Sequence, residues 1–513
     1  MDETAVPQVH PFGEADCEAE VAILGEEYSK YYFSHTRFND TALDSDVFLI
    51  VGRRGSGKTA LAQYFLFQKR LRNAIAIDVD EPDVFQIVLQ KLAVSAAQTR
   101  EVAVPRIAKI WELVIWSVIF RELQDEDVRI KAACIFGDQA GTVSHFIRHT
   151  FKSLLAKFLK TDESLADELE GLISDDRIVA GKEAVLQLAR KRAVIIAFDT
   201  LENYALNDDA MMRATAALIQ CASDFNRAYA HKNIHLKLFV MAEVFPYLKE
   251  EVILNTLKVV RNEIYLHWRP KDLMRLISWR LFRYLRYQGS PLLKDVRVDW
   301  DSYEDVRRKI WDRFFGADIV NGRGVPEKTY PYVLSHTQLR PRQLIVLCNR
   351  IARRAQQAGR FPSFSAEDIT LGIEESQRDL ADEVCNSYSS VYPRVGQIVE
   401  ALAGLPPMFP GRRLDKVAPR TAAAWHHGDY SPLNFRKLVV ELGIIGRMRH
   451  FDERAGYVEA DFEYASEGRI TVNEDDTCII HPLFFEKLNV AADRKLRIYP
   501  FPDHAEFREL GPF

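Results

Sequence analysis

The sequence predicts an α/β fold in which parallel strands alternate with crossover helices, followed by a helical region and a smaller C-terminal domain. Two observations carry this prediction. The apolar stretch Val47–Val51 runs into a glycine-rich loop and then into a helical pattern at Ala60–Leu71. A second apolar run, Ala193–Phe198, ends at Asp199, and further strands and helices alternate after it. Strands that are connected by helices form parallel sheets.

The glycine-rich loop matches the pattern G-x-x-x-x-G-K-[ST], which is the Walker A phosphate-binding loop. Backbone N–H groups of such a loop face the phosphates at the N-terminus of the next helix, whose dipole also favours anions. Lys58 is expected to reach the β- and γ-phosphates, and the Thr59 hydroxyl to bind Mg²⁺. We therefore predict a site for ATP and Mg²⁺ at Gly52, Arg53, Arg54, Gly55, Ser56, Gly57, Lys58 and Thr59.

Asp199 matches the acid of a Walker B strand. An acid at the carboxyl end of a buried strand, beside the strand that carries the phosphate loop, is placed to bind the water shell of Mg²⁺. The other role open to an aspartate at this point is a helix N-cap. After a Walker A loop we favour the metal role, so Thr59 and Asp199 are the predicted metal residues.

The remaining elements complete a five-stranded P-loop NTPase core at residues 35–269, after an N-terminal extension of residues 1–34. Between the second and third strands the periodicity is helical, which predicts a helical insertion at about residues 85–190. The other core elements are expected at Asn73–Asp80 (strand), at roughly Asp208–His231 (helix), in the strand that begins at Ile234 and in the strand Asn262–Trp268.

A basic helical region follows from Pro270, and we expect it to form a helical lid at residues 270–385. Its first helix contains Arg275 and Arg280 among other cations, against the single acid Asp272. Such a run predicts a solvated charged face. Farther on, Arg340 and Arg342 stand at the start of another helix.

Residues 386–513 predict a winged-helix-like domain. Amphipathic patterns at residues 391–405 and 431–446 indicate two helices, and residues 447–472 alternate like a β-hairpin. Acidic residues of the hairpin would repel DNA, so we expect a protein-contact role here, with nucleic-acid contact as the alternative. Between Arg412 and His450 the cations outnumber the acids and predict a local basic patch: Arg412, Arg413, Lys416, Arg420, Arg436, Lys437, Arg447 and Arg449.

Composition and the N-terminal sequence bear on the cellular compartment and on disulfide, zinc and membrane binding. The 513 residues have a formal net charge of −5, and the six cysteines form no C-x-x-C pair, which argues against a disulfide framework or a zinc ribbon. The acidic start lacks the features of a signal peptide. The most apolar window, Ile107–Phe120, contains charges and is too short to span a bilayer, so we expect a buried helix and a cytoplasmic protein without membrane contact.

From about His35 to Gln357 the sequence resembles the AAA+/STAND-type P-loop ATPases, especially the origin-recognition-like ATPases and the bacterial antiphage-defence P-loop ATPases. The Walker A loop is the most specific part of this resemblance. It implies an inter-subunit arginine finger, matched by position to Arg261, and a nucleotide-sensing lid arginine, matched to Arg342. A homo-oligomer is expected, and, because we recognise no effector domain in the chain, a separate effector protein.

Two residues depart from the pattern of these families. A glutamate usually follows the Walker B aspartate, but here Thr200 does, and the nearest carboxylate is Glu202. A base must lie within hydrogen-bond reach of the attacking water, so we expect slow hydrolysis, with Asp199, Glu202 and Arg261 as catalytic candidates. The polar sensor position falls near Glu243, which is either a substitute base or a strand-end acid.

The sequence thus predicts an ATPase that acts as a nucleotide-controlled switch for oligomerisation and partner docking, in antiphage defence. A DNA-binding ATPase that acts through the winged helix is the first alternative. A structural scaffold that binds nucleotide without hydrolysing it is the second.

Overall fold

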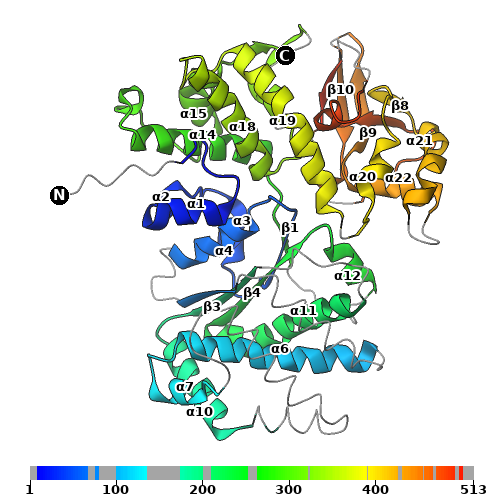
Figure 1. Cartoon of the computed structure of the whole chain (residues 1–513). Helices are drawn as coiled ribbons and strands as arrows, with labels where there is room; N and C mark the ends of the chain where they lie inside the picture. The colour runs from blue at the N-terminus through cyan, green and yellow to red at the C-terminus, as the bar shows by residue number, and fades with distance from the viewer. Residues whose placement is uncertain are drawn as a thin grey trace. The chain divides into compact units, whose positions relative to one another are not determined.

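The chain forms two compact units (Figure 1). Thr36–Leu266 form the P-loop unit, and Met1–His35 together with His267–Phe513 form what we call the bipartite unit. The predicted division into four domains stays a prediction. The computed structural model describes residues 9–67, 75–79, 100–135, 171, 174–199, 209–251, 263–321, 324–389, 391–425, 430–454, 456–465, 469–490 and 496–500.

A five-stranded parallel sheet forms the centre of the P-loop unit. Its strands lie in the order β2-β3-β4-β1-β5, and each neighbouring pair is parallel. This confirms the predicted α/β class with a parallel sheet. The strands are β1 (Leu49–Gly52), β2 (Ile75–Val79), β3 (Val194–Asp199), β4 (Ile234–Met241) and β5 (Ile264–Tyr265).

The strand that ends at Asp199 does not lie beside the strand that carries the phosphate loop, contrary to our expectation. β4 lies between them: it pairs with β3 up to Asp199 and Phe239, and with β1 from Leu49 and Leu238 onward. β4 is the longest strand of this sheet and is buried along nearly its whole length, which suits an interior position. Chain order alone does not give this arrangement.

Helices cover both faces of the sheet (Figure 1). On one face, Phe65 of α4 (Lys58–Phe67) packs against Phe239 with ring centroids 6.2 Å apart. On the other face lie α6 (Arg100–Glu122) and α11 (Asp209–Tyr229), where the buried Trp111 donates its indole N–H to the carbonyl of Ala214 at 3.3 Å. Further α-helices in the described part of this unit are α3 (Arg37–Ala42), α7 (Val128–Ala133), α10 (Asp176–Ala189) and α12 (Phe245–Glu251).

The window predicted as a buried helix lies within α6, and its described apolar residues are buried. Among the residues that the structure describes, no helix is long and apolar enough to cross a membrane.

The bipartite unit is mainly helical up to residue 387, and two of its long helices, α18 and α19, pack closely. Gly372 of α19 permits this, since a Cβ there would lie 2.8 Å from Cγ1 of Ile351 on α18. The elements from Pro270 onward are α14 (Pro270–Tyr287), α15 (Tyr303–Val306), a π-helical turn (Arg307–Trp311), α16 (Asp312–Phe315), the hairpin β6 (Asp318–Val320) and β7 (Pro326–Lys328), α17 (Thr329–Leu334), α18 (Pro341–Gln357) and α19 (Ala366–Ser387).

The N-terminal segment, with α1 (Cys17–Leu24) and α2 (Tyr28–Tyr31), packs on these helices. Phe12 is fully buried and lies near Phe315 and Phe364. Both carboxylate oxygens of Glu20 accept hydrogen bonds from the guanidinium of Arg280, at 2.5 and 3.0 Å, and both side chains are buried. The expected solvated face on α14 is therefore wrong for Arg280, because α1 covers it.

The described residues of the C-terminal part combine short helices with a five-stranded sheet of order β12-β10-β9-β11-β8. β9 (Ile445–Asp452) and β10 (Tyr457–Asp461) pair antiparallel over the residues predicted as a hairpin. The other elements are α20 (Val395–Glu400), β8 (Met408–Pro410), α21 (Arg412–Val417), α22 (Pro432–Glu441), β11 (Thr477–Ile480) and β12 (Arg497–Tyr499). β11 lies between β8 and β9, so the sheet is larger than a simple hairpin wing.

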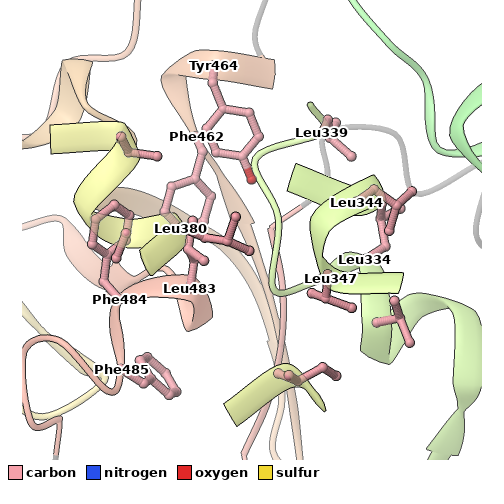
Figure 2. Close-up of a cluster of buried hydrophobic side chains, with 14 of the residues drawn as sticks. Leu334, Leu339, Leu344, Leu347, Leu380, Phe462, Tyr464, Leu483, Phe484 and Phe485 are labelled. Carbon is pink, nitrogen blue, oxygen red and sulfur yellow. The ribbon is translucent and has the colours of Figure 1, made fainter. Parts of the chain in front are cut away.

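One apolar core joins the helical part of the bipartite unit to its C-terminal part (Figure 2). The side-chain amide of Gln338 crosses the junction and donates to the carbonyl of Leu442 at 2.8 Å. The helical and C-terminal parts therefore stabilise each other. The labelled core residues are Leu334, Leu339, Leu344, Leu347, Leu380, Phe462, Tyr464, Leu483, Phe484 and Phe485.

Candidate functional site: the phosphate loop and the carboxyl edge of the sheet

The predicted Walker A residues form a tight loop between the end of β1 at Gly52 and the start of α4 at Lys58. Gly55 and Gly57 have φ angles of +77° and +95°, which residues with a Cβ rarely adopt. A Cβ on Gly52 would collide with the hydroxyl of Ser56. The loop therefore depends on its glycines, and its close backbone turns are of the kind that present N–H groups to an anion.

Lys58 lies over this loop. Its side chain is only 4% exposed, and Nζ donates to the carbonyls of Gly52 at 3.2 Å and Arg53 at 3.4 Å. An ammonium group held here would neutralise part of the charge of phosphates that are bound by the loop. The glycine-lined loop and this cation together fit a nucleotide phosphate chain.

Glu243 contacts the same loop from the end of β4. Its side chain is 2% exposed, and Oε1 accepts a hydrogen bond from the backbone N–H of Arg54 at 3.1 Å. The structure therefore brings Glu243 to the phosphate loop. The role of Glu243, a base or a strand-end acid, stays a prediction.

Asp199 is the last residue of β3 and is buried, and Thr59 is the second residue of α4. The described residues contain no group of three or more His, Cys, Asp or Glu side chains that could hold a metal ion by themselves. Mg²⁺ commonly binds through one or two protein oxygens together with substrate phosphates and water. Asp199 and Thr59 are the residues that would hold it here, and this role stays a prediction.

Three other predicted site residues are not among the described residues of the P-loop unit. Glu202 and Arg261 lie outside the described residues. Arg342 belongs to the bipartite unit, where Nε donates to the carbonyl of Ala15 at 3.0 Å and Nη1 lies 3.5 Å from Oε1 of Glu383. Its role toward nucleotide stays a prediction.

Lys237, which we did not predict as important, supports the chain just before β1. This residue of β4 is 1% exposed, and Nζ donates to the carbonyls of Asp44 and Val47, each at 2.6 Å. Burial lowers the pKa of Lys237 to about 8. The signal in the sequence is a lysine inside an otherwise apolar strand.

Part of the predicted basic patch in the C-terminal part is used internally. Arg436 donates to Asp415 at 2.6 Å, and Arg449 pairs with Asp461 at 2.8 Å. The patch is therefore weaker than its sequence suggests. The exposed cations on and after α21 and on α22 are Arg412, Arg413, Lys416, Arg420 and Lys437.

The parallel sheet, the loop between β1 and α4, and the helices on both faces together give the fold of a P-loop ATPase. No protein-family model matches the sequence, and no curated protein matches it. Among solved structures, the chain is similar to the Aeropyrum pernix ORC2 protein in its ADPNP-ADP complexes, at 13% identity and a TM-score of 0.35 over 87% of this chain and 90% of that one.

The ADP form of the same protein gives 13% identity and a TM-score of 0.30 over 86% of this chain and 89% of that one. The fold assignment rests on the strand order and on the loop.

Proposed function

We propose that this chain is an ATP-binding AAA+/STAND-like ATPase that acts as a nucleotide-controlled switch for oligomerisation and partner docking. The observation that carries the proposal is the phosphate loop, with the Lys58 ammonium held over its carbonyls. The AAA+/STAND assignment and a setting in bacterial antiphage defence are supported by the sequence resemblance alone.

The residues of the loop and of the end of β3 have distinct expected roles in nucleotide binding. The loop N–H groups would donate hydrogen bonds to the phosphate oxygens, and Lys58 would neutralise part of their charge. Thr59 and Asp199 would hold Mg²⁺, which would stabilise charge on the transferred phosphoryl group. Because Thr200 rather than a glutamate follows Asp199, we expect slow turnover.

The test of nucleotide binding is Lys58→Ala. We expect ATP affinity in isothermal titration calorimetry to fall about 100-fold, since a cation that pairs with phosphate is lost. Lys131→Ala, an exposed lysine in the same unit, is the matched control and should bind like the wild type. Equal ATP affinity of Lys58→Ala and wild type, with unchanged circular dichroism, would refute the proposal.

The switch part of the proposal has its own test. A finger supplied by a neighbouring subunit acts only in an oligomer, so ATP turnover per chain should rise with protein concentration, and Arg261→Ala should abolish this rise while ATP binding is retained. Mass photometry with a non-hydrolysable ATP analogue measures the assembly directly. A chain that stays monomeric with the analogue would exclude this mechanism.

A second candidate function is DNA binding through a winged helix in the C-terminal part. The exposed cations Arg412, Arg413, Lys416, Arg420 and Lys437 favour it. Fluorescence anisotropy with duplex DNA at increasing salt tests it, because phosphate contacts give affinity that falls steeply with salt. ATP binding without any DNA binding or ATP turnover would instead support a nucleotide-binding scaffold.

A further inference from the structure

The backbone of the sheet brings Glu243 against the phosphate loop. The β1–β4 ladder ends at the pair Gly52 and Met241, and one more bond, from the N–H of Ala242 to the carbonyl of Gly52 at 3.1 Å, continues it. The chain then turns, with the N–H of Val244 donating to the carbonyl of Met241 at 3.2 Å. Glu243 stands in this turn, so its position beside the loop is fixed by the sheet.

We propose that Glu243 is a positioning and specificity-determining residue of the phosphate loop. It holds the first half of the loop through the N–H of Arg54, and it places a negative charge beside the phosphate cradle. The inference rests on the proposed nucleotide binding and extends it to the choice between nucleotides.

The positioning effect follows from the side-chain hydrogen bonds that fix the backbone of the two halves of the loop. Glu243 holds Arg54 in the first half, and Lys58, at the end of the second half, bonds back to Gly52 and Arg53. Hydrogen bonds to a charged acceptor are about twice as strong as neutral ones. A loop that is ordered before the ligand arrives loses less conformational entropy on binding, which favours affinity.

The specificity effect follows from the charge of Glu243. A buried carboxylate is screened weakly by salt, so it repels phosphate oxygens nearby. This repulsion grows with the charge of the ligand and is offset when a divalent cation accompanies the phosphates. Glu243 therefore disfavours metal-free triphosphate most, metal-free diphosphate less, and the magnesium-bound triphosphate least.

Two variants of Glu243 separate the two effects. Glu243→Gln keeps the size and a carbonyl acceptor for Arg54 but removes the charge, whereas Glu243→Ala removes both. Calorimetric titrations would use ATP and ADP, each with Mg²⁺ or with a chelator. For Glu243→Gln we expect metal-free ATP to bind about tenfold more tightly, with a smaller gain for ADP. For Glu243→Ala we expect magnesium-bound ATP to bind about tenfold more weakly.

Controls keep each outcome decisive. Asp224→Asn removes an exposed carboxylate of α11 in the same unit and should leave every affinity unchanged. Metal-free ATP and ADP affinities of Glu243→Gln that equal those of the wild type would overturn the specificity effect. An unchanged affinity in Glu243→Ala would overturn the positioning effect.

Two further outcomes have different meanings. If wild type and Lys58→Ala both fail to bind ATP, the proposed function itself fails, which is distinct from any result at Glu243. If Glu243→Gln abolishes turnover while the metal-free ATP affinity is unchanged, Glu243 is the catalytic base and the specificity proposal is wrong. Circular dichroism of each variant excludes unfolding as the cause.

Discussion

The two units use their buried polar side chains in different ways. In the bipartite unit such groups bond in fixed partnerships within the core, as Arg280 does with Glu20 and His481 with Tyr464. At the carboxyl edge of the sheet in the P-loop unit, Lys58 and Glu243 instead bond to the backbone of one short loop. Buried polar groups of the first kind stabilise the fold, whereas those of the second kind shape a surface that can receive a ligand.

This difference has an energetic basis. Removing one partner of a buried ion pair leaves the other charge without compensation inside the protein, which is strongly destabilising. Bonds from a side chain to a loop backbone hold that loop, and their loss changes the loop before it changes the core. Substitutions in the bipartite unit should therefore alter stability, and substitutions at the loop should alter ligand affinity.

The largest expected effect is that of Glu20→Ala. It leaves the buried guanidinium of Arg280 without its carboxylate, so the free energy of unfolding of the bipartite unit should fall by about 3–5 kcal/mol. Urea denaturation monitored by circular dichroism measures this loss. ATP affinity should change little, because the phosphate loop belongs to the other unit.

The matched control replaces both partners with apolar residues, Glu20→Leu together with Arg280→Met. Burying no charge at all should restore most of the lost stability. A Glu20→Ala variant that loses less than about 1 kcal/mol would mean that the pair behaves like an exposed one. The proposed difference between the two units would then be wrong for this residue.

Acid should weaken the bipartite unit through His481. Its Nδ1 accepts from the N–H of Leu483, and its Nε2 bonds to the hydroxyl of Tyr464, which donates to the carbonyl of Pro500, so the buried ring is neutral. Burial, and secondarily His336, holds the pKa of His481 well below its ordinary value of 6.5.

As the pH falls through 6.5 the unfolded chain comes to bind up to one more proton than the folded chain, so stability falls. The slope approaches about 1.4 kcal/mol per pH unit about one unit below 6.5. Urea midpoints between pH 7 and pH 5 measure it, and His481→Asn should remove it from the bipartite unit. His235 gives the P-loop unit a slope of its own, because burial lowers the pKa of His235 to about 4. An unchanged slope in His481→Asn would contradict this assignment.

The sequence was informative where the signal is local. The Walker A pattern predicts both the place and the glycine geometry of the loop, because the residues that make it are adjacent in the chain. Arg280 was wrongly expected in solvent, because the segment that covers it lies 260 residues away in the sequence. Likewise, the bond between Arg54 and Glu243 joins residues 189 positions apart. The order of the strands in the sheet likewise depends on tertiary pairing. We therefore expected β1 beside β3, where β4 lies instead.

A smaller effect is expected at Lys237, which tests whether a buried cation of the P-loop unit can also be structural. Lys237→Met keeps the apolar stem but removes the ammonium donor from the carbonyls of Val47 and Asp44, of which Asp44 still accepts from the N–H of Val47 at 3.2 Å. The free energy of unfolding of the P-loop unit should fall by about 1–3 kcal/mol.

The pH dependence of stability shows whether the lost stability comes from the Lys237 ammonium group. Because burial lowers the pKa of Lys237 to about 8 from an ordinary 10.5, the unfolded chain binds more protons between these values, and wild-type stability rises with pH there. The methionine variant should lack that rise in urea titrations at pH 8 and pH 10. A variant as stable as the wild type at pH 7 would show that the two carbonyl bonds only offset the cost of burying the charge.

Replacing helix N-cap residues should have the smallest effects on stability. These effects should be similar in the two units. Ser365 begins α19 with a capping box, since its hydroxyl accepts from the N–H of Asp368 and the Asp368 carboxylate accepts from the N–H of Ser365. Asp175 caps α10 by accepting from the N–H of Arg177 at 2.9 Å. Ser365→Ala and Asp175→Ala should each cost about 1 kcal/mol in urea denaturation, because a cap satisfies backbone groups of its own helix whatever the unit around it does. A loss of unfolding free energy several times larger in one unit would mean that its cap residue also makes tertiary contacts. The difference between the units would then include their helix ends as well as their buried cores.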